Sequence, residues 1–211
     1  SHDVVDLIRQ RFHLKKVGHA GTLDPMATGV LVMLIGAYTK LSAQFMSEDK
    51  EYEGSLILGA SSDTGDAWGR IMPSGKPVNF TAEEIVAAFK RFLGDTEQSP
   101  PMYSAVKVHG RKLYELARKG LSASVAPRKI TVKNIDVLDI SLPEVSFKLT
   151  CSKGTYVRQL CADIGKRLGC GAYMARLNRI RSGRFAIDGA IPVEKLRNMK
   201  IVDLEKILIK I

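Results

Sequence analysis

The chain has 211 residues, of which 45% are hydrophobic and 26% are charged. This balance is typical of a single globular domain, residues 1–211, that can bury a hydrophobic core, and it excludes a low-complexity or disordered chain. Lysine and arginine number 32 against 22 aspartates and glutamates, which gives a net charge of +10. So basic a chain favours a polyanionic partner, nucleic acid before a membrane surface, although a lysine-rich surface that only keeps the protein soluble has the same composition.

The cysteines and the apolar runs argue against several other classes of protein. Cys151, Cys161 and Cys170 form no Cys-x-x-Cys pair and are odd in number, so neither a zinc site nor a disulfide framework is expected. Their apolar neighbours indicate buried thiols in a reducing cytoplasm. The longest apolar run, residues 30–35, is too short to cross a membrane. We therefore expect a cytoplasmic protein without a metal, a cofactor or a membrane contact.

The first half of the chain alternates between helical and extended patterns. Residues 3–12 predict a helix, because their apolar side chains recur on one side and aspartates lie in the first turn. Residues 30–35, bracketed by glycines, predict a buried strand. A helix over residues 39–48 and a strand over residues 52–58 follow.

The second half begins with a helix that Thr81 and Glu84 cap reciprocally and that Gly94 is expected to end. A polar and basic segment, residues 99–128, contains one short helix at about residues 113–118. Residues 145–151 alternate cleanly between apolar and polar, which predicts a half-buried strand. A helix over residues 156–168 ends at Gly169. Strands that come singly and in pairs indicate an α+β fold with a mixed, mostly antiparallel central sheet flanked by helices and loops.

The densest motif lies at residues 18–31, GHAGTLDPMATGVL. Its three glycines allow backbone conformations that other residues avoid and let a ligand come close. Pro25 disfavours a helical conformation at Asp24, so this carboxylate is expected on an extended, glycine-lined loop. Asp24 could equally cap a turn, as aspartate often does before proline, and the motif alone leaves both interpretations open.

Four blocks in order resemble the TruB family of tRNA pseudouridine synthases. Residues 18–31 match every fixed position of the family pattern Gly-His-x-Gly-x-Leu-Asp-Pro-x-Ala-x-Gly-x-Leu. Residues 50–52 (KEY) are similar to its basic-x-Tyr motif. Residues 101–107 (PMYSAVK), with residues 110–114 (GRKLY), are similar to its RNA-gripping insertion, at about residues 101–128. Residues 153–158 (KGTYVR), followed by LGCGA at 168–172 and by Leu177, resemble its third active-site block.

The resemblance implies a pseudouridine synthase fold and a role for each matched residue. Asp24 would be the catalytic carboxylate, with Arg158 as its ionic partner. Tyr52 would stack on the target uracil, and Tyr156 and Leu177 would line its pocket. His19 would hold the rearranged RNA loop. Taken alone, Tyr52, Tyr156 and Leu177 could each be core residues, His19 an ordinary loop histidine and Arg158 a surface arginine.

The chemistry agrees with these roles. Converting uridine to pseudouridine breaks the N-glycosidic bond, rotates the uracil and rejoins it through C5, with no electrons exchanged. One ionised carboxylate can act as nucleophile or as base, and it stays charged in a partly dry pocket only beside a cation. A stacked base cannot be reached, so it must flip out onto an aromatic surface.

Basic residues outside these blocks are candidates for phosphate contacts, although any one of them could simply be solvated. The expected contacts are Lys107, Arg111, Lys112, Arg118, Lys119, Arg176 and Arg179. The implied substrate is the T-arm stem-loop of tRNA, modified at uridine 55 by a monomer that needs no protein partner.

Two features depart from the family pattern. Members usually begin with a strand carrying Lys-Pro and then a Thr-Ser-His-Asp-like sequence, whereas this sequence starts at Ser1-His2-Asp3. We therefore expect that first strand to be missing. Bacterial members also usually carry a C-terminal PUA domain, which we do not expect here.

Two other functions remain open. One is the catalytic subunit of a guide-RNA-directed pseudouridine synthase, which shares the Leu-Asp-Pro and Gly-Thr-Tyr-x-Arg blocks. The other is a non-catalytic RNA-binding module or RNA chaperone on the same scaffold, although a pure binder has no need of Asp24 together with Tyr52 and Arg158.

Overall fold

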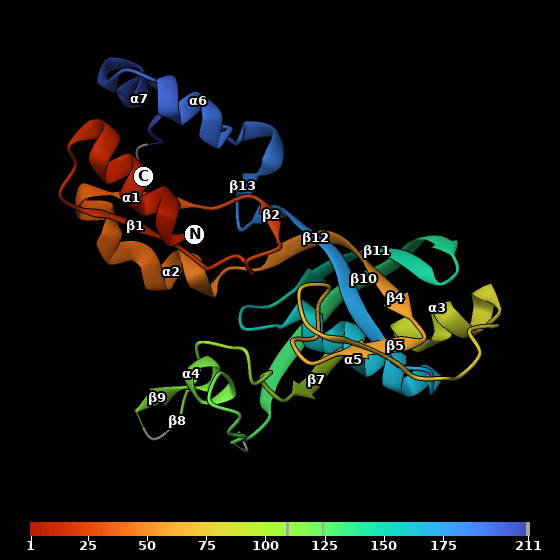
Figure 1. The fold of residues 1–211 in the computed structure, drawn as a ribbon. Coiled ribbons are helices and arrows are strands. Elements are labelled where there is room, and N and C mark those ends of the chain that lie inside the picture. Colours follow the sequence, from red (N-terminus) through yellow and green to blue (C-terminus); the bar gives the residue numbers. More distant parts are fainter. Residues whose placement is uncertain (109, 124, 210–211) are drawn as a thin grey trace. The chain divides into compact units, whose positions relative to one another are not determined.

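A computed structural model describes residues 1–108, 110–123 and 125–209 (Figure 1). The chain forms two compact units. Unit 1 combines residues 1–48 with the chain from Arg179 onward, and unit 2 is residues 49–178. The single domain expected from length therefore consists of two parts, each with its own core.

Unit 2 is built on a curved sheet. In order across it lie β12 (Ala172–Ser182), β4 (Lys50–Leu58), β11 (Glu144–Cys151), β10 (Arg128–Ser141) and β7 (Gly94–Gln98). The β4–β11, β11–β10 and β10–β7 pairs are antiparallel. This arrangement confirms the α+β class and the mostly antiparallel sheet.

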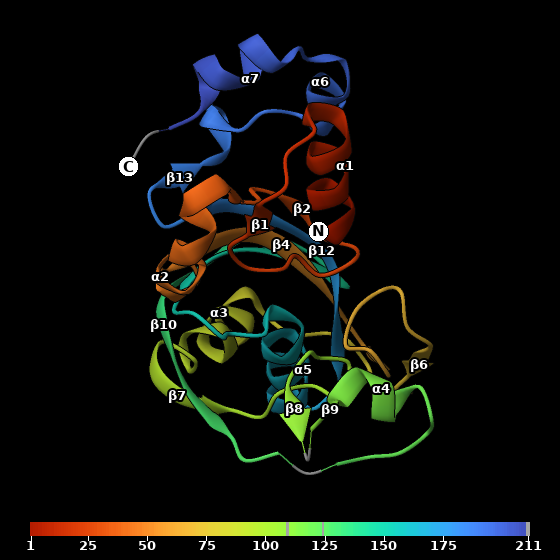
Figure 2. The ribbon, with the colours of Figure 1, turned by 90° about the vertical axis from the view of Figure 1, so that its left-hand side faces the viewer.

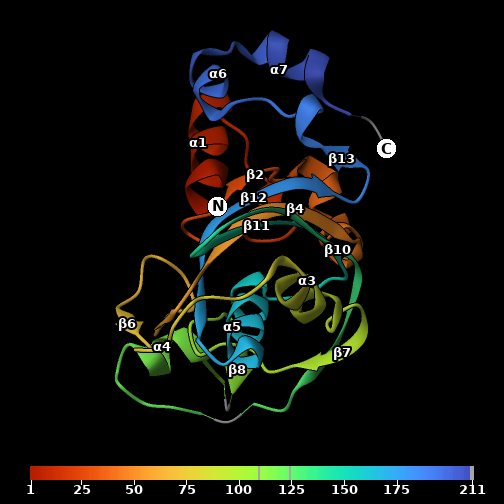
Figure 3. The same cartoon turned by 90° about the vertical axis from the view of Figure 1, so that its right-hand side faces the viewer.

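The core of unit 2 lies between this sheet and two helices. Figures 2 and 3 show α3 (Ala82–Lys90) and α5 (Val157–Leu168) side by side on one face of the sheet. Every second side chain of β11 is buried, as the apolar alternation predicts for a strand covered on one face. The rings of Phe89 on α3 and Phe147 on β11 lie 5.9 Å apart, centroid to centroid.

Short elements complete unit 2. They form two hairpins and one helix: β5 (Ala60–Ser62) with β6 (Ile71–Pro73), β8 (Lys107–Val108) with β9 (Arg111–Lys112), and α4 (Leu113–Ala117). The second hairpin and α4 lie within the basic segment expected to grip RNA, of which residues 109 and 124 fall outside the described residues.

Unit 1 packs helices and short strands around two apolar clusters. One joins Val5, Ile8 and Phe12 of α1 (His2–Phe12) to residues near the end of the chain, and the other surrounds Val30. The strands β1 (Val17–His19) and β3 (Met33–Ile35) pair antiparallel. The other elements are β2 (Thr28–Gly29), η1 (Gly36–Leu41), α2 (Ser42–Ser47), β13 (Phe185–Ala186), η2 (Ile187–Gly189), α6 (Val193–Asn198) and α7 (Ile201–Ile207).

Several predicted boundaries need correction. The strand expected over residues 30–35 is present only at Met33–Ile35. Residues 30–32 are irregular because the backbone of Val30 bonds to Arg179 and the carbonyl of Val32 to Ala20. The helix expected over residues 39–48 is split between η1 and α2.

The helix capped by Thr81 and Glu84 is confirmed, including both hydrogen bonds of the capping box. It ends at Lys90, however, and Gly94 begins β7 instead of ending the helix. In the described part of the chain, no helix is long and apolar enough to cross a membrane.

Candidate active site and RNA-binding surface

Asp24 lies on the loop that joins β1 to β2 in unit 1. Its carbonyl accepts a hydrogen bond from the amide of Ala27, 2.9 Å away, so the residues after it form a tight turn. Gly21 has a φ of +96°, a conformation that a side chain would strain. The expected glycine-lined loop around the carboxylate is therefore present, and Asp24 is half-buried in it.

Arg179 holds this loop in place. Its guanidinium donates from Nε to the carbonyl of Val30 at 2.7 Å and from Nη2 to the carbonyl of Gly21 at 3.0 Å. The residue is only 2% exposed. The two carbonyl groups that accept these hydrogen bonds lie on either side of the Asp24 turn. The planar guanidinium of Arg179 therefore fixes the distance between the two ends of the loop.

This burial corrects the assignment of Arg179 as a phosphate contact. A phosphate cannot approach a guanidinium that is enclosed and already bound to two carbonyl groups. We propose a positioning role for Arg179 instead, because it acts on the conformation of the Asp24 loop.

His19 is the last residue of β1, on the strand that leads into the Asp24 loop. Burial lowers its pKa, and the nearby positive charge of Arg179 acts in the same direction. Its Nδ1 is buried and has no hydrogen-bond partner among the described residues. A neutral imidazole with a vacant ring nitrogen is compatible with the contact to RNA expected of it, which stays a prediction.

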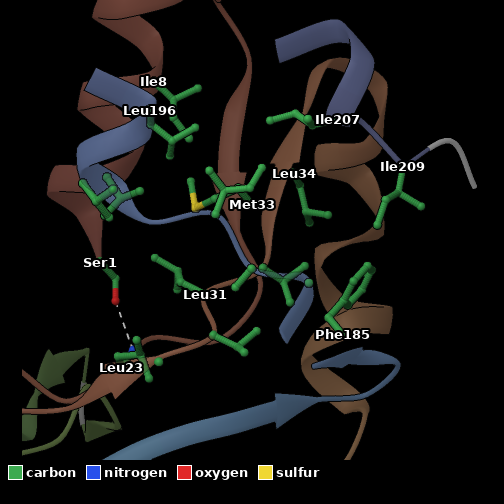
Figure 4. Close-up of a pocket in the computed structure, with 18 of the residues that line it drawn as sticks. Ser1, Ile8, Leu23, Leu31, Met33, Leu34, Phe185, Leu196, Ile207 and Ile209 are labelled. Atoms are coloured by element: carbon green, nitrogen blue, oxygen red, sulfur yellow. Dashed lines mark hydrogen bonds between the residues drawn. The ribbon is translucent and has the colours of Figure 1, made fainter. Parts of the chain in front are cut away.

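Unit 1 also contains a cavity of about 1180 Å³ that borders the Asp24 loop. Figure 4 shows that its wall is mostly aliphatic, with Leu31, Met33 and Leu34 facing Leu196 and Ile207. A wall of this kind suits apolar side chains better than a nucleotide. The expected RNA-contacting arginines and lysines do not line it.

Arg158 is a buried charge of unit 2 with several bonded partners. Its side chain is 6% exposed and its Nη1 lies 3.6 Å from a carboxylate oxygen of Asp66, which is equally buried. The same guanidinium donates to the carbonyl of Thr64 and to that of Tyr103, both at 3.0 Å. Arg158 therefore joins the β5–β6 turn to the start of the basic segment.

The predicted uracil-pocket residues lie on three elements of unit 2. Tyr52 is on β4, opposite Leu149 of β11, and is half-buried. Tyr156 precedes α5, where its backbone exchanges two hydrogen bonds with the side-chain amide of Gln98. Leu177 is 6% exposed on β12. Their contact with a uracil stays a prediction.

The basic segment presents a cluster of cations around one aromatic ring. Lys112 Nζ and Arg118 Cζ each lie 5.4 Å from the centre of the Tyr114 ring. Leu113, the first residue of α4, is fully buried and anchors the segment to the core of the protein. The exposed cations of the hairpin and α4 region are Lys107, Arg111, Arg118 and Lys119, Lys112 is half-buried, and the exposed carboxylate of Glu115 lies among them. The charges therefore face solvent from a fixed base.

Arg176 faces solvent on β12 but already has partners. Its Nη2 lies 2.6 Å from a carboxylate oxygen of Glu144, and its Nε donates to the hydroxyl of Ser55 at 3.3 Å. An exposed ion pair is weak, so this arginine can still exchange a carboxylate for a phosphate.

The two predicted partners Asp24 and Arg158 belong to different units, and their pairing stays a prediction. Sequence reasoning missed Asp66, the buried carboxylate beside Arg158. Its only sequence signal is the polar turn Asp63-Thr64-Gly65-Asp66 within a strand-rich stretch. Among the described residues, no group of three or more histidine, cysteine or acidic side chains is placed to hold a metal ion.

Comparison with known proteins decides the family. Residues 9–157 match the family described as "TruB family pseudouridylate synthase (N terminal domain)", and residues 158–208 match "tRNA pseudouridylate synthase B C-terminal domain". The chain belongs to the TruB family of pseudouridine synthases. The first match contains Asp24 and Tyr52, and the second contains Arg158 and Leu177.

Individual TruB relatives match over nearly the whole chain. The tRNA pseudouridine synthase B of Opitutus terrae is 44% identical over 211 residues, which is all of this chain and 88% of that protein. The protein of the same name from Clostridium tetani is 47% identical over 201 residues, covering 95% of this chain and 70% of that one.

Solved structures show the same fold at lower identity. A chain of a Cbf5–Nop10–Gar1 complex is 31% identical with a TM-score of 0.72, and a chain of an H/ACA ribonucleoprotein bound to substrate RNA is 28% identical with a TM-score of 0.69. Each match covers 93% of this chain but only 50% and 48% of the other, so this chain spans about half the length of those structures.

The anchoring of the TruB motif loop by Arg179 gives a testable prediction. Arg179→Lys keeps the charge but loses the fork that reaches Gly21 and Val30, and a buried carbonyl left without a donor costs about 1–3 kcal/mol. We expect urea unfolding to show a loss of stability in this range. The control is Arg197→Lys on the exposed face of α6, which should change stability by less than about 0.5 kcal/mol. Equal stability of the two variants would contradict the anchoring role.

Proposed function

We propose that this protein is a tRNA pseudouridine synthase that isomerises uridine 55 in the T loop, with Asp24 as the catalytic carboxylate. The observation that carries the proposal is the match of the whole chain to proteins named tRNA pseudouridine synthase B, together with a carboxylate on a loop that a buried arginine holds rigid. A binder without catalysis would need no such loop.

The reaction is balanced within the substrate. The bond from uracil N1 to the ribose C1′ breaks, the base turns, and a bond from C5 to C1′ forms. C5 loses its proton and N1 gains one, so no electrons are exchanged and no redox cofactor is required. Asp24 serves either as nucleophile at the sugar or as the base that starts an elimination.

The other site residues bind the flipped uracil and balance the negative charge of Asp24. Tyr52 receives the flipped uracil, and Tyr156 and Leu177 bound its pocket. Arg158 provides the cation that keeps Asp24 ionised during catalysis. Its anchoring by Asp66 and two carbonyl groups supports this proposal, because a guanidinium fixed on one side presents its remaining donors in a constant direction.

The basic segment grips the RNA. Four exposed cations on a fixed hairpin and helix would bind the phosphates of the T loop and, with His19, hold the loop open. We propose that the protein needs no guide RNA or protein partner and acts as a monomer. Activity on a naked stem-loop transcript tests this against a guide-RNA-directed role within a larger assembly; the similar solved structures belong to an H/ACA ribonucleoprotein and to a Cbf5–Nop10–Gar1 complex.

We also propose that the protein is cytoplasmic. The three cysteines are free and buried, and burial raises the pKa of the Cys151 thiol to about 12. Such thiols are stable and unreactive in a reducing compartment.

The catalytic role predicts the effect of Asp24→Asn. The side chains are nearly isosteric, so folding and RNA binding should survive while turnover falls by at least about 10³-fold. Release of tritium from C5-labelled uridine in a T-arm transcript, without added metal or cofactor, measures the loss. Asp188→Asn makes the same charge change at an exposed position of η2 and should be fully active. Substantial turnover by the Asp24 variant would remove this carboxylate from the mechanism.

The RNA grip predicts the salt dependence of binding. Each phosphate contact on single-stranded RNA contributes about 0.7 to the slope of log affinity against log salt. Replacing Arg111, Lys112, Arg118 and Lys119 by alanine should flatten this slope and weaken binding to the stem-loop without abolishing turnover at saturating RNA.

The matched control removes two lysines and two arginines from the exposed C-terminal ends of α3 and α5. Its substitutions are Lys90→Ala, Arg91→Ala, Lys166→Ala and Arg167→Ala. The control should keep the wild-type slope. If both quadruple variants change the slope equally, the basic segment does not contact RNA and net charge alone explains the binding.

A further inference from the structure

Trp68 is a large aromatic side chain exposed to solvent. It is the single tryptophan of the sequence, and 71% of it is exposed. Burying an indole is among the larger hydrophobic gains available to a folding chain, so one left in water on an ordered turn calls for an explanation. The resemblance to the family assigns it no role.

The turn that carries Trp68 is rigid. The carboxylate of Asp66 accepts hydrogen bonds from the amide of Trp68 at 3.1 Å and from the hydroxyl of Thr64 at 2.7 Å. The carboxylate of Asp63 accepts from the amide of Arg70 at 2.8 Å. Two side chains thus fix the backbone on either side of the indole.

Close packing and strand contacts add to this rigidity. A Cβ atom at Gly69 would lie 2.3 Å from the Asp63 carboxylate and from the Thr64 hydroxyl, so the turn has no room to spare. The amide of Ala67 donates to the carbonyl of Met174 on β12 at 2.9 Å. An exposed aromatic ring on such a turn loses little conformational entropy when it stacks on a ligand.

The turn is also tied to the proposed active site. Asp66 bonds the amide of Trp68 through one carboxylate oxygen and faces the guanidinium of Arg158 through the other, at 3.6 Å. Arg158 in turn holds Tyr103, where the basic segment begins.

The exposed cations of the hairpin and of the basic segment favour a nucleic acid as the partner of Trp68. Arg70, two residues further on, is exposed, as is Asp63 on the same turn. The basic segment, which Arg158 joins to this turn through the Tyr103 carbonyl, carries the further cations described above. Unpaired bases stack on exposed aromatic side chains when nearby cations bind the phosphates. The exposed side chains of Ile71 and Met72 extend the apolar surface of the hairpin, but a purely apolar protein contact would make no use of the link to Arg158.

We propose that Trp68 stacks on an unpaired base of the RNA substrate, beside the nucleotide that enters the uracil pocket. This inference rests on the proposed function, because it assumes that Arg158 lies at the reacting uridine. Trp68 would then be a binding residue that helps to hold the loop open while its neighbour is flipped.

The single tryptophan allows a direct test in the unmodified full chain. A T-arm stem-loop RNA is titrated into the protein while tryptophan emission and its quenching by acrylamide are followed. Stacking should quench the emission and protect the indole from acrylamide with the same saturation curve as RNA binding, measured separately with labelled RNA. Binding without any change in emission or protection overturns the proposal.

Two variants give an independent measure. Trp68→Ala should weaken stem-loop binding by about 5- to 150-fold, the range for loss of one stacked base, whereas Trp68→Phe should recover most of the affinity. An alanine variant that folds and binds like wild type overturns the proposal, and so does a phenylalanine variant no better than alanine.

Tritium release by the wild-type protein separates this inference from the proposed function. If pseudouridine forms and RNA binds while Trp68 stays accessible, only the stacking proposal fails, and a protein partner becomes the better occupant of the hairpin. If the protein neither binds nor converts the RNA, the proposed function fails and the stacking proposal falls with it.

Discussion

The arrangement of unit 2 around its proposed site depends on the burial of one positive charge. A guanidinium with 6% exposure has lost most of its hydration, and this cost is offset only where its donors are satisfied. Arg158 meets the requirement with the carboxylate of Asp66 and the carbonyls of Thr64 and Tyr103. Because these acceptors lie on two different loops, neither loop can move far without losing a hydrogen bond to the buried guanidinium.

Unit 1 also contains a buried arginine that joins two segments of the chain, and the hydrogen bonds described for its guanidinium go to carbonyl groups. Arg179 satisfies its buried guanidinium with the carbonyls of Gly21 and Val30. A carbonyl has only a partial charge, so the pair fixes geometry more than it neutralises the arginine. The two ends of the Asp24 loop are therefore held in place by one buried side chain.

The sequence was most informative where the determining contacts are local. The capping box of Thr81 and Glu84 and the alternation along β11 depend on residues a few positions apart, and both are present as predicted. The motif around Asp24 could be assigned because its glycines and proline restrict the backbone directly. The family resemblance then placed Arg158 among the functional residues.

What could not be predicted depends on contacts between distant parts of the chain. Arg179 looked like one more member of a basic run, and only the fold brings its side chain to a carbonyl 158 positions earlier. Asp66 lies 92 positions from Arg158, with no periodic pattern to join them. The strand β10 was missed because charged residues interrupt its alternation, and the boundary between the two units within β12 has no local signal.

The central claim, that the fixed planar fork of Arg158 serves catalysis, is tested most directly by Arg158→Lys. Lysine keeps the positive charge but cannot bind Asp66 and the two carbonyls while still facing the substrate. We predict that turnover in the tritium-release assay falls by about 10²-fold or more. The variant should stay folded, with a free energy of unfolding lower by about 1–3 kcal/mol as for Arg179→Lys, and Arg167→Lys on the exposed face of α5 should change neither quantity. A lysine variant as active as wild type, or one that does not fold, would contradict this account.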